Sequence, residues 1–346
     1  MSETVSVKDV ASRAGVSLGT VSNVLNRPDR VTEATRARVH AAIDELGYVR
    51  NEAARQLRAG RSRTIGLLVL DVANPFFTDL AAGVEIAADA NNLGVMLCNS
   101  RESESREDKY LSMLQEQRVF GILITPMSAR SKNISRIARS GTPVVMVDRP
   151  SSSNFCSVSV DDVSGGRQAV AHLIACGHTR IGFVGGPSSI GQVEDRLAGA
   201  RLAMEQAGLN PKDLAVLETP GLNVAAGRAA GDQLLTRGAR RPTAVFCAND
   251  LLALGMLQSM TANRLAVPDD MAIVGYDDID FAAAAAVALT SIRQPTTQLG
   301  QAAAELLIEE VRAPKTHGHR QVIFAPELVV RSSTQGGASG GQAVAG

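Results

Sequence analysis

The sequence lacks the patterns of a signal peptide, a membrane span and a disulfide framework. Its start, MSETVSVKDV, has no apolar run after a basic segment, so no signal peptide is expected. No apolar stretch approaches the length that a membrane span needs. The only cysteines are Cys98, Cys156, Cys176 and Cys247, which lie far apart without a CxxC pair. We expect them to be buried free thiols of a cytoplasmic protein, and neither a disulfide framework nor metal ligands.

Signatures of enzymes are also missing. The stretch GFVGGPSSIG at residues 182–191 is rich in glycine, but it does not follow GxGxxG and no Walker lysine comes after it. The GASGG at residues 337–341 has the spacing GxSxG without the strand, turn and helix of a nucleophile elbow. No histidine has a ligand spacing such as HExxH, and each is expected to be structural or exposed. The histidines are His40, His172, His178, His317 and His319. The sequence therefore predicts no enzyme, no metal site and no cofactor.

The length and composition indicate a globular protein of several domains. At 346 residues the chain is long for one hydrophobic core, so two or three domains are expected. Hydrophobic residues make up 45% of the chain and charged residues 20%, which is ordinary. The net charge is zero, but residues 1–63 hold 11 Lys and Arg against 7 Asp and Glu, which leaves 24 against 28 elsewhere. A basic head on an acidic body favours a head that binds a polyanion.

The stretch Val7–Asn26, VKDVASRAGVSLGTVSNVLN, predicts two helices joined by a short turn. The spacing of one apolar helical face is met by Val7, Val10, Ala11 and Ala14. Gly15 can take the positive φ of a sharp helix exit, and Ser17 can N-cap the second helix. That helix would point Val21, Val24 and Leu25 inward and leave Leu18, Gly19, Thr20, Ser22 and Asn23 outside. Such a helix can lie in the major groove of DNA, and a hairpin that merely packs on another element is the alternative.

Two further segments complete the head. A third helix is expected from about Glu33 to Leu46, between an N-cap at Thr32 and Gly47. Residues 51–58 of the following segment, NEAARQLRAGRSR, have good helix formers but are too few for a stable isolated helix. We expect this segment, whose only large apolar residue is Leu57, to fold when it docks on DNA or on a symmetry mate. A plain charged linker is the alternative.

From residue 64 on, strand-length apolar runs alternate with helical stretches. The expected strands are residues 65–70, 95–98, 121–125, 144–147, 181–185, 244–248 and 272–276. The expected helices are residues 77–91, 105–117, 165–176, 195–207, 223–237, 250–263 and 298–311. This alternation predicts parallel sheets buried on both faces, divided between two doubly wound subdomains. Ligands bind such sheets at the carboxyl ends of the strands.

Over residues 5 to about 334, the chain resembles the LacI/GalR family of bacterial transcriptional regulators. The family's helix-turn-helix is similar to the stretch Val7–Asn26, and its hinge helix to NEAARQLRAGRS. Later landmarks follow in the family's order: TIGLLVLDVANPFF, DRP, SVDD, GHTRIGFVGGP, RLAGARLAM, FCANDLLALG, VGYDDID and LTSIRQP. The resemblance implies an all-α headpiece followed by an α/β effector domain of two parallel-sheet, periplasmic-binding-protein-like subdomains.

The expected domain boundaries combine the resemblance with the strand pattern. They are a headpiece at 1–50, a hinge helix and linker at 51–63, an effector and dimerisation domain at 64–334, and a disordered tail at 335–346. The N-subdomain would comprise about 64–161 and 293–324, and the C-subdomain about 162–292 and 325–334.

The resemblance also implies which residues contact DNA. Family positions that touch phosphates and base edges correspond to Ser17, Thr20, Ser22 and Asn26. The two positions that most distinguish operators are Leu18 and Gly19, with Asn23 next to them. Leu18 offers only apolar contact, so Asn23 is the best candidate for a base-edge hydrogen bond. Leu57 matches the hinge leucine that wedges into the minor groove.

For the effector, the resemblance implies hydrogen bonds from Arg196, Asn249 and Asp277. Such charged groups suit a hydroxyl-rich ligand, and an Arg–Asp ion pair that closes the cleft is the alternative. Weaker candidates for the lining are Asp71, Phe76, Phe77, Ser100, Asp148 and Leu222. Leu222 stands where many relatives carry an aromatic ring, which disfavours stacking of a flat base. Ile190 and Gln192 stand at two positions that contact the corepressor in some relatives, which disfavours a purine-type corepressor.

The function implied is a cytoplasmic, nucleoid-associated repressor of carbohydrate-utilisation genes. It would be a homodimer on a pseudo-palindromic operator in double-stranded DNA, without a membrane partner, and a small sugar would change its affinity. A sugar-binding protein with the same body is disfavoured by the intact head and the missing signal peptide. A nucleotide-dependent α/β enzyme is disfavoured by the missing phosphate fingerprint.

Overall fold

The computed structural model describes residues 5–49, 62–128, 131–151 and 154–335. The hinge prediction for residues 51–61, including Leu57, and the tail from 336 on lie outside these ranges. The chain forms two compact units, of which one ends at Ser62 and the other begins at Arg63. Within the described ranges no helix is long and apolar enough to cross a membrane.

The first unit is a three-helix headpiece. Its helices are α1 (Val7–Ala14), α2 (Leu18–Asn26) and α3 (Glu33–Leu46), with a short 3₁₀ turn at Pro28–Arg30. Gly15 and Gly47 end α1 and α3 with φ values of 62° and 60°, as predicted from their positions. The small core is made by Val10, Ala11, Ala14, Val21, Val24, Val39 and Ala42. Thr32 does stand before α3, but its hydroxyl bonds to that of Thr35 at 3.0 Å and does not cap the helix backbone.

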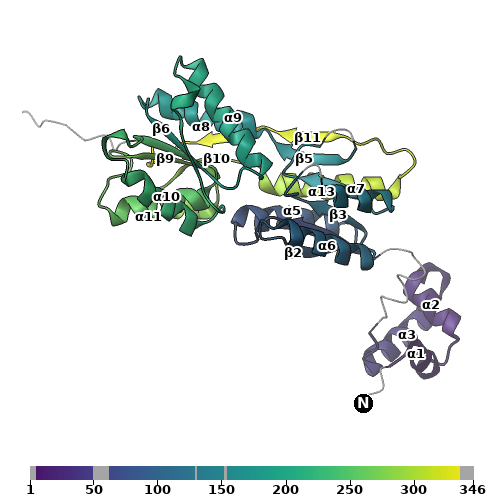
Figure 1. The fold of residues 1–346 in the computed structure, drawn as a ribbon. Helices are drawn as coiled ribbons and strands as arrows, with labels where there is room; N and C mark the ends of the chain where they lie inside the picture. The colour runs from purple at the N-terminus through teal and green to yellow at the C-terminus, as the bar shows by residue number, and fades with distance from the viewer. Residues whose placement is uncertain (1–4, 50–61, 129–130, 152–153, 336–346) are drawn as a thin grey trace, which may run out of the picture. The chain divides into compact units, whose positions relative to one another are not determined.

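In the second unit, one six-stranded sheet forms the N-subdomain (Figure 1). Its strands, in spatial order, are β11 (Gln321–Phe324), β5 (Cys156–Val160), β4 (Val144–Val147), β3 (Gly121–Ile124), β1 (Thr64–Val69) and β2 (Gly94–Asn99), all parallel. One face packs on α5 (Pro75–Asp89) and α13 (Thr296–Arg312), and the other on α6 (Glu104–Glu116) and α7 (Lys132–Arg139).

A second six-stranded sheet forms the C-subdomain. Its order is β12 (Glu327–Val329), β10 (Thr290–Arg293), β9 (Ala272–Asp277), β8 (Ala244–Cys247), β6 (Ile181–Gly185) and β7 (Ala215–Glu218), with only the β10–β12 pair antiparallel. One face packs on α8 (Asp162–Ala175) and α9 (Gly191–Gln206), and the other on α10 (Val224–Leu235) and α11 (Asp250–Ala262) (Figure 1). A short helix, α12 (Asp280–Ala284), follows β9.

The chain crosses between the two sheets three times: after β5, after β10 and between β11 and β12. The predicted fold class is therefore confirmed. The pattern missed β5, β7, β10, β11, β12, α7 and α12. It missed β5 and β10 because their buried hydroxyl residues interrupt the apolar runs. Ser291 in β10, for instance, is buried because its hydroxyl donates to Asp250 Oδ1 at 2.7 Å.

Two other expectations were wrong. Strand β2 is not buried on both faces, since it is an edge strand and Leu97 is 42% exposed. Of the four thiols, Cys98, Cys156 and Cys247 are buried, but Cys176 at the end of α8 is exposed.

Three helix pairs approach so closely that only glycine fits at the contact. A Cβ on Gly300 of α13 would lie 2.1 Å from the carbonyl oxygen of Leu80, and one on Gly83 of α5 would lie 2.1 Å from that of Thr297. The α8–α9 and α10–α11 pairs repeat this reciprocal arrangement through Gly166 with Gly199 and Gly227 with Gly255. The backbones therefore touch directly, and each pair is a rigid unit within its subdomain.

We expect Gly300→Ala to destabilise the effector domain. The added methyl cannot avoid a backbone oxygen, so α5 and α13 must separate, at a cost on the order of 3 kcal/mol. Denaturant unfolding of the full chain measures this change. The matched control is Gly94→Ala, at the start of β2, where a Cβ meets nothing within 4 Å. Equal stability of the two variants would show that the close approach is not rigid.

Candidate functional site: a DNA-reading helix and an inter-subdomain cleft

In the head, α2 exposes the face that the sequence predicted. Ser17 caps the helix, since its Oγ accepts a hydrogen bond from the backbone N–H of Thr20 at 3.1 Å. Leu18 is 45% exposed, although large apolar side chains are usually covered. Gly19 and Asn23 are exposed beside it, while Val21 and Val24 are buried in the head core. An exposed, uncharged helix N-terminus of this kind fits the major groove.

The hydroxyl and amide groups of α2 are held in place by local hydrogen bonds. Ser17 Oγ and Thr20 Oγ1 lie 2.9 Å apart, and Asn26 Nδ2 donates to the carbonyl oxygen of Ser22 at 2.8 Å. These side chains are therefore oriented before any DNA arrives. Leu57, the remaining residue of the predicted interface, lies outside the described residues.

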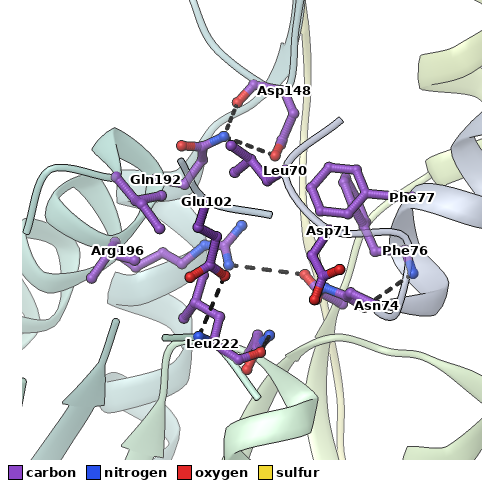
Figure 2. Close-up of a pocket in the computed structure, with 14 residues that line it drawn as sticks. Leu70, Asp71, Asn74, Phe76, Phe77, Glu102, Asp148, Gln192, Arg196 and Leu222 are labelled. Atoms are coloured by element: carbon purple, nitrogen blue, oxygen red, sulfur yellow. Dashed lines mark hydrogen bonds and ion pairs between the residues drawn. The ribbon is translucent and has the colours of Figure 1, made fainter. Parts of the chain in front are cut away.

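In the second unit, a cavity lies between the two sheets where strands of both end (Figure 2). Eight of the nine predicted ligand residues line it: Asp71, Phe76, Phe77, Asp148, Arg196, Leu222, Asn249 and Asp277. Ser100 does not, because it is buried and its hydroxyl donates to the carbonyl oxygen of Val69 at 3.1 Å. The other lining residues are Leu70, Asn74, Glu102, Ile190, Gln192 and Val193.

Of these, the apolar residues Leu70 and Val193 and the polar residues Asn74 and Glu102 were not predicted from the sequence. Asn74 directly precedes α5 and N-caps it, which a search for an Asn–Pro helix start could have found. Glu102 follows β2 and has a φ of 53°, which no sequence pattern announces.

Arg196 is the only cation among the cavity-lining residues, and it is 4% exposed. Its Nε donates to Asp162 Oδ1 at 2.8 Å and its Nη1 to the carbonyl oxygen of Ala248 at 2.7 Å. The guanidinium also stacks on the ring of Tyr276, 3.6 Å from the centroid. The alternative of an Arg–Asp ion pair is met at 3.9 Å between Arg196 Nη1 and Asp277 Oδ1, but the closer partner is Asp162, the first residue of α8.

Asp277 ends β9 with its carboxylate aimed at the cavity. Its backbone has a φ of 104°, a left-handed conformation that a non-glycine residue adopts only under constraint. Oδ2 accepts from Asn74 Nδ2 at 3.0 Å, and Oδ1 accepts from Gln294 Nε2 at 2.8 Å. Burial raises the pKa of Asp277 to about 6, although Arg196 and the two amides lower it.

Asp148 follows β4 and is 3% exposed. Gln192 Nε2 donates to its Oδ2 at 2.9 Å and to its carbonyl oxygen at 2.7 Å. Burial, together with the nearby charge of Asp162, raises the pKa of Asp148 to about 8. Its Oδ1 is buried and has no hydrogen-bond partner among the described residues. The raised pKa favours the protonated form of this carboxyl, in which it can donate a hydrogen bond.

Polar contacts join the two subdomains around the cavity. Beside the Asn74–Asp277 and Asp148–Gln192 pairs, Arg149 Nη1 lies 2.5 Å from Asp195 Oδ2. Glu102 Oε1 accepts from the backbone N–H of Leu222 at 3.4 Å, and burial raises the pKa of Glu102. Figure 2 shows Glu102 reaching toward Leu222. These contacts hold the two lining surfaces together.

The space left inside is small. The cavity measures about 30 Å³, enough for one or two waters but not for a sugar. A wider opening of about 550 Å³ adjoins it and shares Asp71 and Glu102 as walls. Glu102 lines both spaces, and it contacts the backbone of Leu222, which lines the inner cavity but not the opening.

Asn249 lines the cavity and also makes two hydrogen bonds that stabilise the fold. Its Oδ1 caps α11 by accepting from the backbone N–H of Leu252 at 2.9 Å, and its Nδ2 donates to the carbonyl oxygen of Leu222 at 3.1 Å. The residue therefore ties the segment that holds Leu222 to α11, and a change at Asn249 would disturb both.

Comparisons with known proteins agree with this arrangement. Residues 6–51 match the model of bacterial regulatory proteins of the lacI family, and residues 170–334 match a periplasmic binding protein-like domain. The HTH-type transcriptional repressor PurR of Photobacterium profundum is 36% identical over 95% of this chain and 98% of its own length. The ribose operon repressor of Escherichia coli K12 is 37% identical over 94% of this chain and 99% of its own.

Among solved structures, the lac repressor dimer bound to operator and the anti-inducer ONPF has a TM-score of 0.83. It is 30% identical and covers 96% of this chain and 99% of its own. A helix-turn-helix head, two parallel-sheet subdomains and full-length relatives that are repressors lead to one conclusion. The chain belongs to the lacI family of bacterial regulatory proteins and is a DNA-binding transcriptional repressor.

Proposed function

We propose that this protein represses carbohydrate-utilisation genes as a homodimer and that a small sugar in the cleft changes its affinity for the operator. The observation that carries the sugar assignment is the set of buried groups facing the cavity. It combines the guanidinium of Arg196 with the carboxyls of Asp277 and Asp148, whose pKa values burial raises. Neighbouring hydroxyls both donate and accept hydrogen bonds, so a sugar can satisfy such a mixed set.

The relatives leave two ligand classes open, because PurR and the ribose operon repressor are about equally similar to this chain. The lining favours a sugar over a purine. Ile190 and Leu222 are aliphatic, and the rings of Phe76 and Phe77 pack edge to face on each other, 5.0 Å between centroids. A flat base would need a ring face to stack on, whereas a sugar needs the polar groups that are present.

The switch would work through opening and closing of the cleft. A sugar that enters must replace some of the contacts that join the subdomains, so it binds the open and closed forms with different affinity. Linkage then requires that operator affinity change with the same coupling free energy, typically about 1–3 kcal/mol.

The proposed DNA contacts are those of α2: Ser17, Leu18, Gly19, Thr20, Ser22, Asn23 and Asn26. We further propose that the cleft binds its ligand without catalysing a reaction, since the named relatives are repressors.

The operator should be read mainly by α2. We expect the full chain to select a pseudo-palindrome from random DNA duplexes and to bind it less tightly as salt rises, because phosphate contacts release counterions. Asn23→Ala should lower the affinity by about 1–3 kcal/mol and change the selected bases. A matched control is Asn263→Ala at the C-terminal end of α11, an exposed asparagine of the effector domain. Selection of no sequence at low salt would refute the DNA-reading role.

The ligand should depend on Asp277. A panel of pentoses, hexoses and nucleosides, screened by thermal shift, should contain a sugar that raises the Tm of the full chain. We expect Asp277→Asn to weaken binding of that sugar at least about tenfold, because the charge-assisted hydrogen bond is lost, while operator binding persists. The control is Asp269→Asn, an exposed aspartate after α11. A nucleoside that alone stabilises the protein would contradict the sugar assignment.

Asp148 should make stability depend on pH. Its pKa rises from the usual 3.8 to about 8 on folding, so the folded state binds more protons between these values. The free energy of unfolding therefore falls as pH rises from about 4 to 8. Asp148→Asn removes this loss, and its Tm relative to wild type should be higher at pH 8 than at pH 5. An unchanged difference would show that Asp148 does not titrate in this window.

A further inference from the structure

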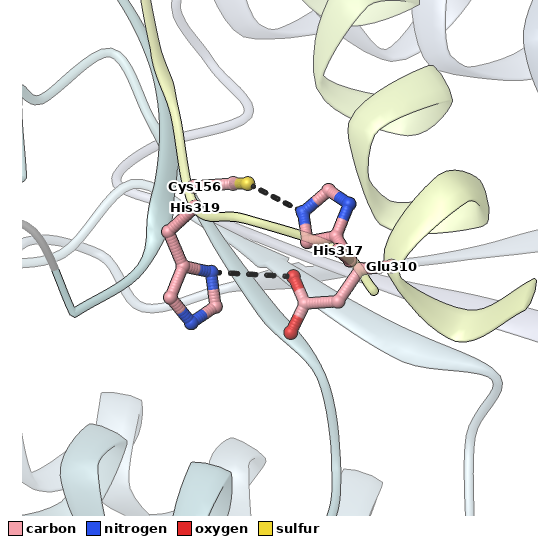
Figure 3. Close-up of side chains that lie close together, drawn as sticks. All are labelled: Cys156, Glu310, His317 and His319. Atoms are coloured by element: carbon pink, nitrogen blue, oxygen red, sulfur yellow. Dashed lines mark hydrogen bonds and ion pairs between the residues drawn. The ribbon is translucent and has the colours of Figure 1, made fainter. Parts of the chain in front are cut away.

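A second group of ligating side chains lies at the far end of strand β5 from the cleft (Figure 3). Cys156 opens this strand, Glu310 stands in the last turn of α13, and His317 and His319 lie in the loop that leads to β11. One ligand atom from each of the four lies within 4.8 Å of every other. Neither the ligand cleft nor the head uses any of these residues.

Only part of this group is joined by hydrogen bonds. Cys156 Sγ and His317 Nε2 lie 3.1 Å apart. His319 Nδ1 lies 4.0 Å from Glu310 Oε2, too far for a hydrogen bond. Glu310 Oε2 is buried and accepts no hydrogen bond among the described residues. Buried carboxylate oxygens normally have a hydrogen-bond partner, so this oxygen, which faces two imidazoles and a thiol, lacks a partner that a purely structural cluster would supply.

We propose that Cys156, Glu310, His317 and His319 bind a zinc-class divalent transition metal. The donors are one sulfur, two imidazole nitrogens and one carboxylate oxygen, the set that Zn²⁺ takes in proteins. Tetrahedral zinc with bonds of about 2.0–2.3 Å places its ligand atoms roughly 3.3–3.8 Å apart. The group therefore has to contract by at most about 1.5 Å at its widest pair. The side chain of His319 is 36% exposed and free to make that movement.

The position in the fold indicates what the metal does. The site ties the C-terminal end of α13 and the loop before β11 to β5, and β5 and β11 are neighbouring strands. Both strands continue directly into crossings to the C-subdomain. A bound metal therefore stabilises β5 and β11 at their amino ends. Two of the three crossings leave from the carboxyl ends of these same strands. Spacing along the sequence could not show this, because Cys156 lies 154 residues before Glu310.

The test uses the full chain without a histidine tag, stripped of metal and kept reduced by a non-chelating phosphine. Titration with Co²⁺, a coloured substitute for Zn²⁺, should produce a thiolate-to-cobalt charge-transfer band that saturates at one equivalent. We expect Cys156→Ser to abolish the band. His319→Ala, at an exposed site where folding is not at risk, should weaken binding about tenfold or more.

The matched control is Cys176→Ser. The Sγ of Cys176 lies 3.8 Å from His172 Nε2, but no carboxylate or second histidine completes a group there within the described residues. The band should persist in this variant, and Zn²⁺ should raise the Tm of wild type and Cys176→Ser but not of Cys156→Ser. Absence of the band in wild type, its survival in Cys156→Ser, or equal Zn²⁺ stabilisation of all variants would overturn the proposal.

Discussion

The effector domain depends on one buried cation. Arg196 has only carboxyls, a carbonyl and a ring face around it, and no other lining residue carries positive charge. One guanidinium cannot keep Asp162, Asp277 and Asp148 all ionised at low exposure, so burial raises the pKa of each. In the proposed function, this shortage of positive charge suits the cleft to a neutral, hydroxyl-rich molecule. Asp277 can accept a hydrogen bond, Asp148 can donate one when it is protonated, and the guanidinium lies between them. A second cation would form ion pairs with these carboxyls, and fewer of their oxygens would then be available for hydrogen bonds to a ligand.

The placement of Arg196 is itself a consequence of helix packing. A Cβ at Gly166 of α8 would lie 2.1 Å from the carbonyl oxygen of Arg196, so the two helix backbones meet at the residue that carries the charge. Asp162 sits one turn earlier on α8 and receives the guanidinium. The glycine contact holds the backbone of Arg196 and the ion pair holds its side chain, so the guanidinium has a fixed position at the cavity wall.

Much of this arrangement follows from sequence, and the exceptions have physical reasons. Val/Ile/Leu runs such as that of β1 predict buried parallel strands, and Gly15 and Ser17 predict the turn between α1 and α2. The strand β10 was missed because its Thr290 and Ser291 are polar, and their burial depends on partners far along the chain. Eight of the nine ligand residues predicted through the resemblance line the cavity, but Glu102 was not predicted, since its direction comes from a positive φ that several side chains can adopt. Local patterns predict elements, whereas contacts between distant residues decide which polar groups face a cavity.

Rigidity within the subdomains determines where a switch can act. Glycine contacts lock α5 on α13, α8 on α9 and α10 on α11, so opening the cleft cannot be absorbed by loosening these pairs. The subdomains are joined by three chain crossings, by apolar contacts within one core cluster that includes residues of both sheets, and by polar contacts such as Arg149–Asp195 and Glu102–Leu222. A half-buried contact of this kind contributes on the order of 1 kcal/mol. An allosteric coupling of about 1–3 kcal/mol then corresponds to one to three such contacts. A ligand with a few hydroxyls can exchange that many, so a small sugar is large enough to drive the switch.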